Sequence, residues 1–346
     1  MAVPDSLSAW RSFTDRQNIK PDQLTIEQIK SLSSEEKTSY DESRFAWLGA
    51  DVVLETNDTE ALTHKAQILV ARNTALSGTA RRGLAISGSA GRGKSTAAML
   101  IGKRHEKVMR KKLGRYDDGY APVAYAVVPP GTTPKMMMLA FSNFLGLLTH
   151  SRATAQELTN QIVGVMRALG VSLVVVDEVH NLKTNHQIGS EAASALKVFS
   201  ERLDATFLYA GIDLVQADLF AGDMGRQLKG RMVLHEMRAY SHNTQAQRDA
   251  WTELVLGIEA LLPLGRHAAG SLEAQASYLY DRTGGSIGTL RALLNDAAIS
   301  AIINGQEHVD RRLLDMTSTD YAAEEFHTST PRREQAKPRA LKVAEE

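Results

Sequence analysis

Cysteine is missing from this sequence of 346 residues. Its absence excludes disulfides, thiol catalysis, iron–sulfur clusters and cysteine-based zinc sites. The sequence also has no apolar run of 18 residues, and its first residues lack a basic segment followed by an apolar one. We therefore expect a cytoplasmic protein that neither spans a membrane nor carries a secretory signal.

An excess of one charge is missing as well, because 40 lysines and arginines balance 40 aspartates and glutamates. This balance excludes a uniformly basic DNA-coating protein but leaves room for local basic patches. Apolar residues make up 43% of the chain and charged residues 23%, which is typical of a globular protein with a packed core. The length suits one large domain with a smaller one beside it.

Short aliphatic runs alternate with helical patterns in the middle of the chain. The predicted strands are 83–88, 122–128, 172–176, 205–210 and 232–237. Helical patterns at 95–112, after Thr133 and at 155–169 lie between strands. This alternation predicts an α/β fold, a parallel sheet with helices on both faces. Residues 243–316 show helical patterns only, which indicates a second, helical domain.

The sharpest motif is GSAGRGKS, a complete G-x-x-x-x-G-K-[ST] phosphate loop between a predicted strand and a predicted helix. Glycines let backbone N–H groups point at phosphate oxygens, and the helix N-terminus adds positive potential. Lys94 would reach the β- and γ-phosphates, and the Ser95 hydroxyl would be a ligand of Mg²⁺. The predicted nucleotide-binding residues of this loop are Gly88, Ala90, Gly91, Arg92, Gly93, Lys94, Ser95 and Thr96.

A second motif completes the predicted site, because the aliphatic strand Leu173-Val-Val-Val176 ends in Asp177 and Glu178. Carboxylates at the C-terminal end of such a strand lie where open α/β sheets bind ligands. Asp177 can hold Mg²⁺ directly or through water, and Glu178 can polarise the water that attacks the γ-phosphate. Together the two motifs predict a hydrolytic NTPase. His180 is either an ordinary turn residue or a sensor of the γ-phosphate.

The order of these elements resembles that of the AAA+ ATPases and, within them, the TniB-type transposition ATPases, relatives of the TnsC, MuB and IstB target-selection proteins. The resemblance covers about 40–303 of the chain. It rests on seven motifs in their order: Tyr40-x-x-x-Arg44-x-x-Trp47, GSAGRGKST, Val128-Pro-Pro-Gly-Thr-Thr-Pro-Lys135, VVVDEVHNL, LYAGIDL, Gln227-x-x-x-Arg231 and Thr283-Gly-Gly-Ser-Ile-Gly288-x-Leu290.

This resemblance implies ATP and Mg²⁺ as cofactors, and a ring or filament in which a neighbour's arginine stabilises the γ-phosphate. Arg226 and Arg231 are the candidates for that arginine. The sequence departs from the AAA+ pattern at two points. Asp213 is a weak substitute for the Asn or Thr usual after the fourth strand, and Gly288 replaces the sensing arginine of the lid, with Arg291 one turn further on. Slow hydrolysis, suited to a switch, is therefore expected.

Basic residues crowd the end of the helix after the phosphate loop. Four fall on one face by their spacing and would repel one another unless an anion lay opposite, although a solvated helix end is the alternative. The resemblance implies that this helix end and the start of the next helix face DNA. The predicted contacts, to the backbone of double-stranded DNA and without sequence preference, are Lys103, Lys107, Arg110, Lys111, Thr132, Thr133 and Lys135.

The resulting hypothesis is an ATP-switched homo-oligomer that marks target DNA and recruits a transposase or integrase subunit. A signalling or defence ATPase whose oligomerisation is controlled by nucleotide is the alternative, and a helicase or replication loader is a third reading. The basic end of the chain is either solubilising or a hook for the transposase. Four regions are expected: an N-terminal extension (1–45), an AAA+ core (46–240), a helical lid (241–316) and a disordered tail (317–346).

Overall fold

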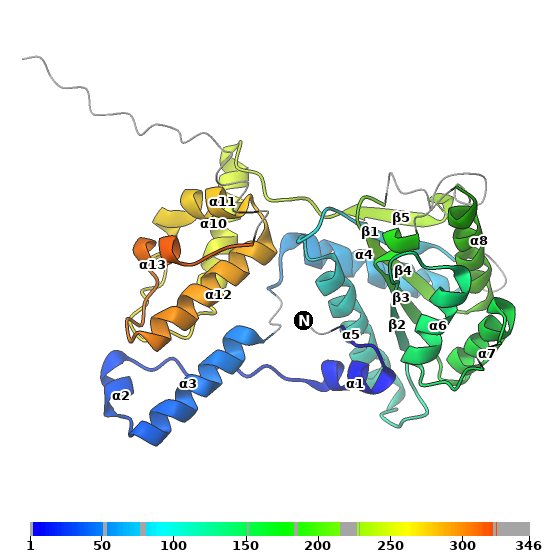
Figure 1. Cartoon of the computed structure of the whole chain (residues 1–346), viewed down its shortest axis with the longest axis horizontal. Helices are drawn as coiled ribbons and strands as arrows, with labels where there is room; N and C mark the ends of the chain where they lie inside the picture. Colours follow the sequence, from blue (N-terminus) through cyan, green and yellow to red (C-terminus); the bar gives the residue numbers. More distant parts are fainter. Residues whose placement is uncertain are drawn as a thin grey trace, which may run out of the picture. The chain divides into compact units, whose positions relative to one another are not determined.

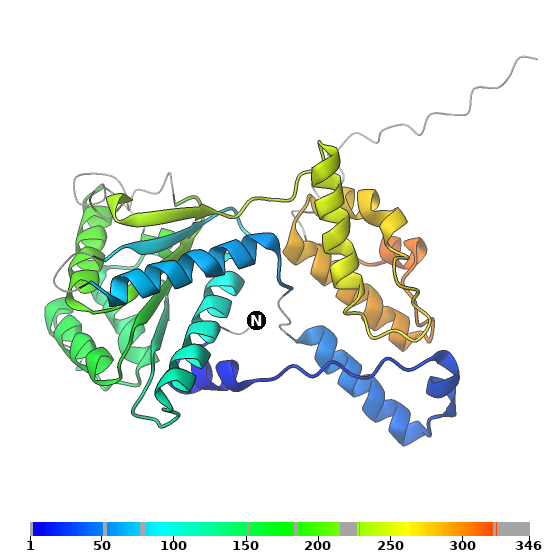
Figure 2. The ribbon, with the colours of Figure 1, turned by 180° about the vertical axis from the view of Figure 1, so that it is seen from behind.

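The protein is described by a computed structural model (Figures 1 and 2). The residues that it describes are 3–50, 54–76, 81–150, 152–182, 186–214, 227, 229–320 and 323. The chain divides into two compact units, Met1–Ala239 and Tyr240–Glu346, and each is described by itself. The predicted tail, 317–346, lies outside the described residues except for 317–320 and 323.

The first unit is built on a five-stranded sheet in which every neighbouring pair is parallel. Its strands are β1 (Gly83–Ser87), β2 (Val123–Val127), β3 (Leu173–Asp177), β4 (Thr206–Gly211) and β5 (Met232–Glu236). The order across the sheet is β2-β3-β4-β1-β5. All five predicted strands are present, and the predicted α/β fold is confirmed.

Helices cover both faces of this sheet (Figures 1 and 2). α4 (Asn57–Thr74) and α5 (Lys94–Leu113) lie on one face, and α6 (Pro134–Phe144), α7 (Ala155–Ala168) and α8 (His186–Arg202) lie on the other. For α5 to α8, which connect strands, the reason is the handedness of the crossovers. The step from β1 to β2 runs across the sheet in the opposite direction to the steps from β2 to β3 and from β3 to β4, so right-handed connections place their helices on opposite faces.

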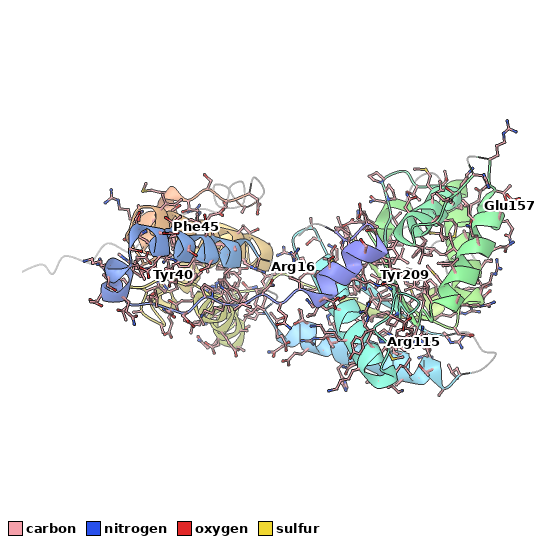
Figure 3. All side chains as sticks on the ribbon, turned by 90° about the horizontal axis from the view of Figure 1, so that it is seen from below. Arg16, Tyr40, Phe45, Arg115, Glu157 and Tyr209 are labelled. Atoms are coloured by element: carbon pink, nitrogen blue, oxygen red, sulfur yellow. The ribbon has the colours of Figure 1, made fainter. Side chains whose placement is uncertain are left out.

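Local capping fixes where the helices of the outer layer begin. The Thr133 side chain caps α6, with Pro134 in its first turn. α7 begins with a capping box, in which the Thr154 hydroxyl accepts from the Glu157 N–H and the Glu157 carboxylate accepts from the Thr154 N–H. Glu157 stands on the outer side of α7 (Figure 3).

The N-terminal region contains more helix than the sequence patterns indicate. It forms α1 (Leu7–Asp15), α2 (Ile26–Ser31) and α3 (Ser34–Gly49). α1 is an amphipathic helix capped by Ser6, and it packs against α5. Its Trp10 belongs to the main hydrophobic core, so the first helix of the predicted N-terminal extension contributes to the core of the first unit.

The second unit is helical. It contains α10 (Gln245–Glu259), the short turn η3 (Glu273–Gln275), α11 (Ala276–Thr283), α12 (Ile287–Ile303) and α13 (Arg311–Met316). The fully buried Trp251 donates its indole N–H to the Ala276 carbonyl at 2.7 Å and ties α10 to α11. Among the described helices, none alone has the length and apolar composition to cross a membrane. Only Glu273–Thr283 and Ile287–Ile303 taken together reach them, and that pair is bent by 118°.

Candidate nucleotide-binding site

The phosphate loop joins the end of β1 to the start of α5, as predicted. Its first glycine has no room for a side chain, because a Cβ on Gly88 would lie 2.4 Å from the Met237 carbonyl oxygen. Gly93 precedes α5 with φ at 80°, in the left-handed region that glycine adopts without strain. It also provides no capping side chain. The first turn of α5 therefore presents backbone N–H groups toward the loop, as an anion site requires.

Lys94 is the first residue of α5 and is only 6% exposed. Its ammonium donates to the Ser89 carbonyl oxygen at 2.7 Å, so it lies folded over the loop. Burial lowers the pKa of Lys94, and the charges of three carboxylates oppose that shift. These carboxylates are Glu178, Asp177 and Asp213. The lysine charge is thus held in a partly desolvated place, where a phosphate would be a strong counter-ion.

Asp177 ends β3 and is almost completely buried. Both of its carboxylate oxygens have partners. The Tyr125 hydroxyl donates to Oδ2 at 2.6 Å, and the Glu178 backbone N–H donates to Oδ1 at 2.8 Å. The carboxylate is therefore fixed in one orientation at the C-terminal edge of the sheet, where a metal ion bound to the phosphates would lie.

Glu178 follows with φ at 55°, an unusual value for a residue with a side chain. Its side chain is 36% exposed, so it is accessible to a water molecule. His180 Nδ1 lies 3.2 Å from the Glu178 carboxylate and also 3.2 Å from the Ile212 N–H that donates to it. One nitrogen cannot serve both contacts in one protonation state, since it must be bare to accept and protonated to donate. His180 therefore lies between Glu178 and the end of β4, and its Nδ1 makes one of the two contacts at a time.

The end of β4 lies between the two predicted motifs because β4 separates β1 from β3. Asp213 has φ at 45°, and its charge acts on Lys94. The Leu214 N–H donates to the Ser87 hydroxyl at 3.0 Å and ties this segment to the start of the phosphate loop. Asp213, which the sequence offered only as a weak substitute for the usual Asn or Thr after the fourth strand, thus lies close enough for its charge to act on Lys94.

One residue of the site was missed by sequence analysis. Tyr125 lies in the middle of a predicted strand, and only its position beside the strand of Asp177 would have indicated a role. The described residues contain no group of three or more histidines, aspartates and glutamates close enough to hold a metal ion by themselves. The chemistry of the site instead fits a metal held jointly by Ser95, Asp177 and the phosphates.

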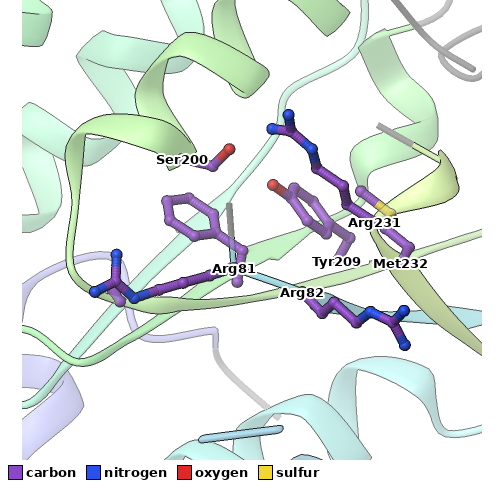
Figure 4. Close-up of a pocket in the computed structure, with 9 residues that line it drawn as sticks. Arg81, Arg82, Ser200, Tyr209, Arg231 and Met232 are labelled. Carbon is purple, nitrogen blue, oxygen red and sulfur yellow. The ribbon is translucent and has the colours of Figure 1, made fainter. Parts of the chain in front are cut away.

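Of the two candidate arginines, Arg226 lies outside the described residues, and Arg231 lies at the opposite edge of the sheet from the phosphate loop. Arg231 immediately precedes β5, and its guanidinium pairs with Glu201 at 2.6 Å. It lines a pocket with about 20 Å³ of space, room for roughly one water molecule, beside Tyr209 and Arg82 (Figure 4). A five-residue strand spans roughly 16 Å, so Arg231 cannot reach the phosphates of its own chain.

The predicted DNA-binding face on α5 needs correction. Lys107 and Lys111 are exposed, but Lys103 donates to the carbonyl oxygens of Phe13 and Arg16, at 2.9 and 3.0 Å, and closes the C-terminal end of α1. Arg110 is only 6% exposed and pairs at 2.6 Å with the buried Glu106. Lys103 and Arg110 are therefore occupied inside the protein.

The predicted DNA contacts at the start of α6 also include residues that are buried or already hydrogen-bonded within the protein. Thr132 is fully buried and donates to the Pro129 carbonyl, so it does not face a ligand. Thr133 is exposed but its hydroxyl caps α6, and Lys135 is half-buried. Of the whole predicted set, Lys107 and Lys111 remain the exposed cations.

Solved structures share this fold. The Aeropyrum pernix ORC2 protein in its ADP form matches with a TM-score of 0.56 and 17% identity, over 81% of this chain and 72% of that chain. The A. pernix ORC1 protein in complex with DNA gives 0.54 and 16%, over 81% and 66%. Cdc6p from Pyrobaculum aerophilum gives 0.54 and 16%, over 78% and 68%. The fold is that of the AAA+ ATPases, as predicted.

The sequence matches one protein family. The family model of the bacterial TniB protein matches residues 44–242, which is more than half of the chain. Among curated proteins, no match to this sequence is found.

Proposed function

Because the chain belongs to the bacterial TniB family, we propose that it is an ATP-dependent regulator of DNA transposition. In this proposal it assembles on double-stranded target DNA, recruits a transposase or integrase subunit, and is switched by ATP hydrolysis. One observation carries the enzymatic part. Lys94, Asp177 and Glu178 converge with the phosphate loop at the C-terminal edge of the parallel sheet.

Each residue of that edge has a role in the proposed hydrolysis. Backbone N–H groups of the loop and the Lys94 ammonium bind the phosphates, and the Ser95 hydroxyl with Asp177 holds Mg²⁺. The metal, when bound, neutralises charge on the phosphate oxygens. Glu178 accepts a proton from a water molecule and orients it, with His180 beside its carboxylate at 3.2 Å.

Assembly is supported by the position of Arg231. An arginine at the edge away from its own phosphate loop can contact nucleotide only on a neighbouring copy. Its ion pair with Glu201 is partly exposed, at 34% and 40%, and such pairs contribute about 0–1 kcal/mol. Little free energy is therefore lost when Arg231 leaves Glu201 and contacts a phosphate group instead. This suits an arginine that acts only after subunits associate.

DNA binding is supported by the exposed cations Lys107, Lys111 and Lys112 near the end of α5. They would contact backbone phosphates, which gives affinity without base recognition. The ORC1 protein, which has the same fold, was solved in complex with DNA, and this supports the proposal.

The test is electron microscopy of the full chain with a non-hydrolysable ATP analogue, with and without duplex DNA of random sequence. We expect ordered oligomers that need both ligands. Assemblies that need nucleotide but ignore DNA would favour the signalling or defence ATPase instead. A protein that stays monomeric with both ligands would contradict assembly in either form.

A further inference from the structure

The N-terminal helix α1 is packed against the interior of the first unit, and Trp10 is its most deeply buried side chain. Trp10 of α1 is fully buried, and its indole N–H donates to the fully buried Glu106 of α5. The helix backbone at Gly102 makes room for the indole, since a Cβ there would lie 2.7 Å from the Trp10 ring. Lys103 of α5 donates to two carbonyl oxygens at the C-terminal end of α1.

The indole of Trp10 rests on Tyr125 of β2. The two rings are stacked, with centroids 5.6 Å apart and planes 15° from parallel. Tyr125 is itself fully buried and stands opposite Val175 in the parallel pairing of β2 with β3. Side chains alternate along a strand, so Tyr125 shares a face of the sheet with Asp177, two residues beyond Val175.

The hydroxyl of Tyr125 is the side-chain donor to Asp177. Both side chains are buried, and the phenol O–H donates to Oδ2 at 2.6 Å. Because the Glu178 N–H holds Oδ1, removing the phenol would free the carboxylate to rotate about a single remaining contact.

We propose that Tyr125 is a positioning residue for the metal-binding carboxylate of Asp177, and that Trp10 of α1 clamps Tyr125 in place. The inference rests on the proposed function, since it concerns the same nucleotide site. Partners that orient a metal-ligating group commonly change metal affinity or activity by about 10–100-fold. By thermodynamic reciprocity, a helix that tightens metal binding must itself be held more firmly when the metal is bound.

The first measurement uses the variant Tyr125→Phe, which removes only the hydroxyl. Binding of a fluorescent, non-hydrolysable ATP analogue to the full chain is followed while Mg²⁺ is added. We expect the variant to need about 10–100-fold more Mg²⁺ for half-saturation, with unchanged affinity for the analogue in EDTA. Tyr209→Phe is the matched control, because Tyr209 is an equally buried tyrosine of β4 that interacts with Ser200 at the other edge.

The second measurement follows hydrogen exchange of the α1 amides by mass spectrometry. In the wild type, Mg²⁺ added to the analogue-bound protein should slow exchange in α1, and in Tyr125→Phe it should not. Trp10→Phe, which keeps an aromatic ring but loses the donor to Glu106, should raise the Mg²⁺ requirement in the same direction by a smaller factor.

The outcomes separate the two proposals. If the wild type binds the analogue with Mg²⁺ and Tyr125→Phe needs the same Mg²⁺ concentration within twofold, the positioning role is wrong and the nucleotide site stands. If exchange in α1 ignores Mg²⁺ in the wild type, the clamp by Trp10 is wrong. If the wild type does not bind the analogue at all, the proposed function fails and this inference fails with it.

Discussion

The two edges of the sheet differ in how their charges are arranged. At the N-terminal edge, Arg81 pairs with Asp204 and Arg231 with Glu201, at 2.8 and 2.6 Å. At the C-terminal edge, one buried lysine faces several carboxylates, and the backbone at Glu178 and Asp213 takes left-handed values. At the N-terminal edge each of these two arginines is paired with a carboxylate, whereas the C-terminal edge concentrates charge and strained backbone around one lysine. The second arrangement is typical of ligand sites.

The largest expected effect comes from Glu178→Gln at the C-terminal edge. The amide keeps the size of the side chain but cannot accept the proton of the attacking water, so turnover should fall at least about 10²-fold while ATP still binds. Steady-state ATPase assays and equilibrium nucleotide binding measure the two quantities. Glu201→Gln, at the other edge, should retain turnover. Wild-type turnover in Glu178→Gln would show that the catalytic assignment is wrong.

Arg231→Ala tests whether the N-terminal edge acts only across subunits. We expect turnover to fall roughly 10–100-fold, because a donor to developing phosphate charge is lost. A mixture of Arg231→Ala with Glu178→Gln should recover part of the activity. In that mixture, sites with an intact Glu178 can receive Arg231 from the other variant. Absence of recovery in mixed oligomers would mean that Arg231 does not act in trans.

Charge reversal on α5 should weaken DNA binding and leave the sites at both edges of the sheet unchanged. Lys107→Glu with Lys111→Glu should weaken duplex binding and reduce the slope of log affinity against log salt by about 0.9 for each lost phosphate contact. Nucleotide binding in the absence of DNA should not change. Lys30→Glu, an exposed reversal on α2, is the control. An unchanged slope would remove this surface from the proposal.

The smallest effect concerns stability at the N-terminal edge. His105 contacts the Ser172 hydroxyl at 2.8 Å, just before β3, and burial lowers its pKa from 6.5 to about 4. The unfolded chain therefore binds more protons between these values, and stability falls as pH falls from 6.5 toward 4. His105→Gln should reduce the loss of unfolding free energy between pH 7 and 5 by up to about 2 kcal/mol, measured by urea titration. His150→Gln, an exposed site, should not.

Local patterns were sufficient to predict most of the sheet and the two nucleotide motifs. The phosphate loop lies between β1 and α5, and Asp177 ends β3, because each depends on neighbours in the chain. Contacts distant in sequence were not predictable in this way. Lys103 looks like a free cation until α1 is seen against α5, and the approach of Asp213 to Lys94 depends on the order of the strands. The pair of Arg110 with Glu106 is by contrast local, at i,i+4 spacing on α5.

The left-handed backbone at Glu178 has a consequence for evolution and engineering. A residue with a side chain in that region loses of order 1–3 kcal/mol of folding free energy to backbone strain. Glycine or asparagine would adopt the same backbone conformation with less strain. A library of variants sorted only for thermal stability should therefore enrich glycine at this position and discard the carboxylate. Selection for stability alone would then remove the carboxylate that we propose activates water, so turnover has to be selected together with stability.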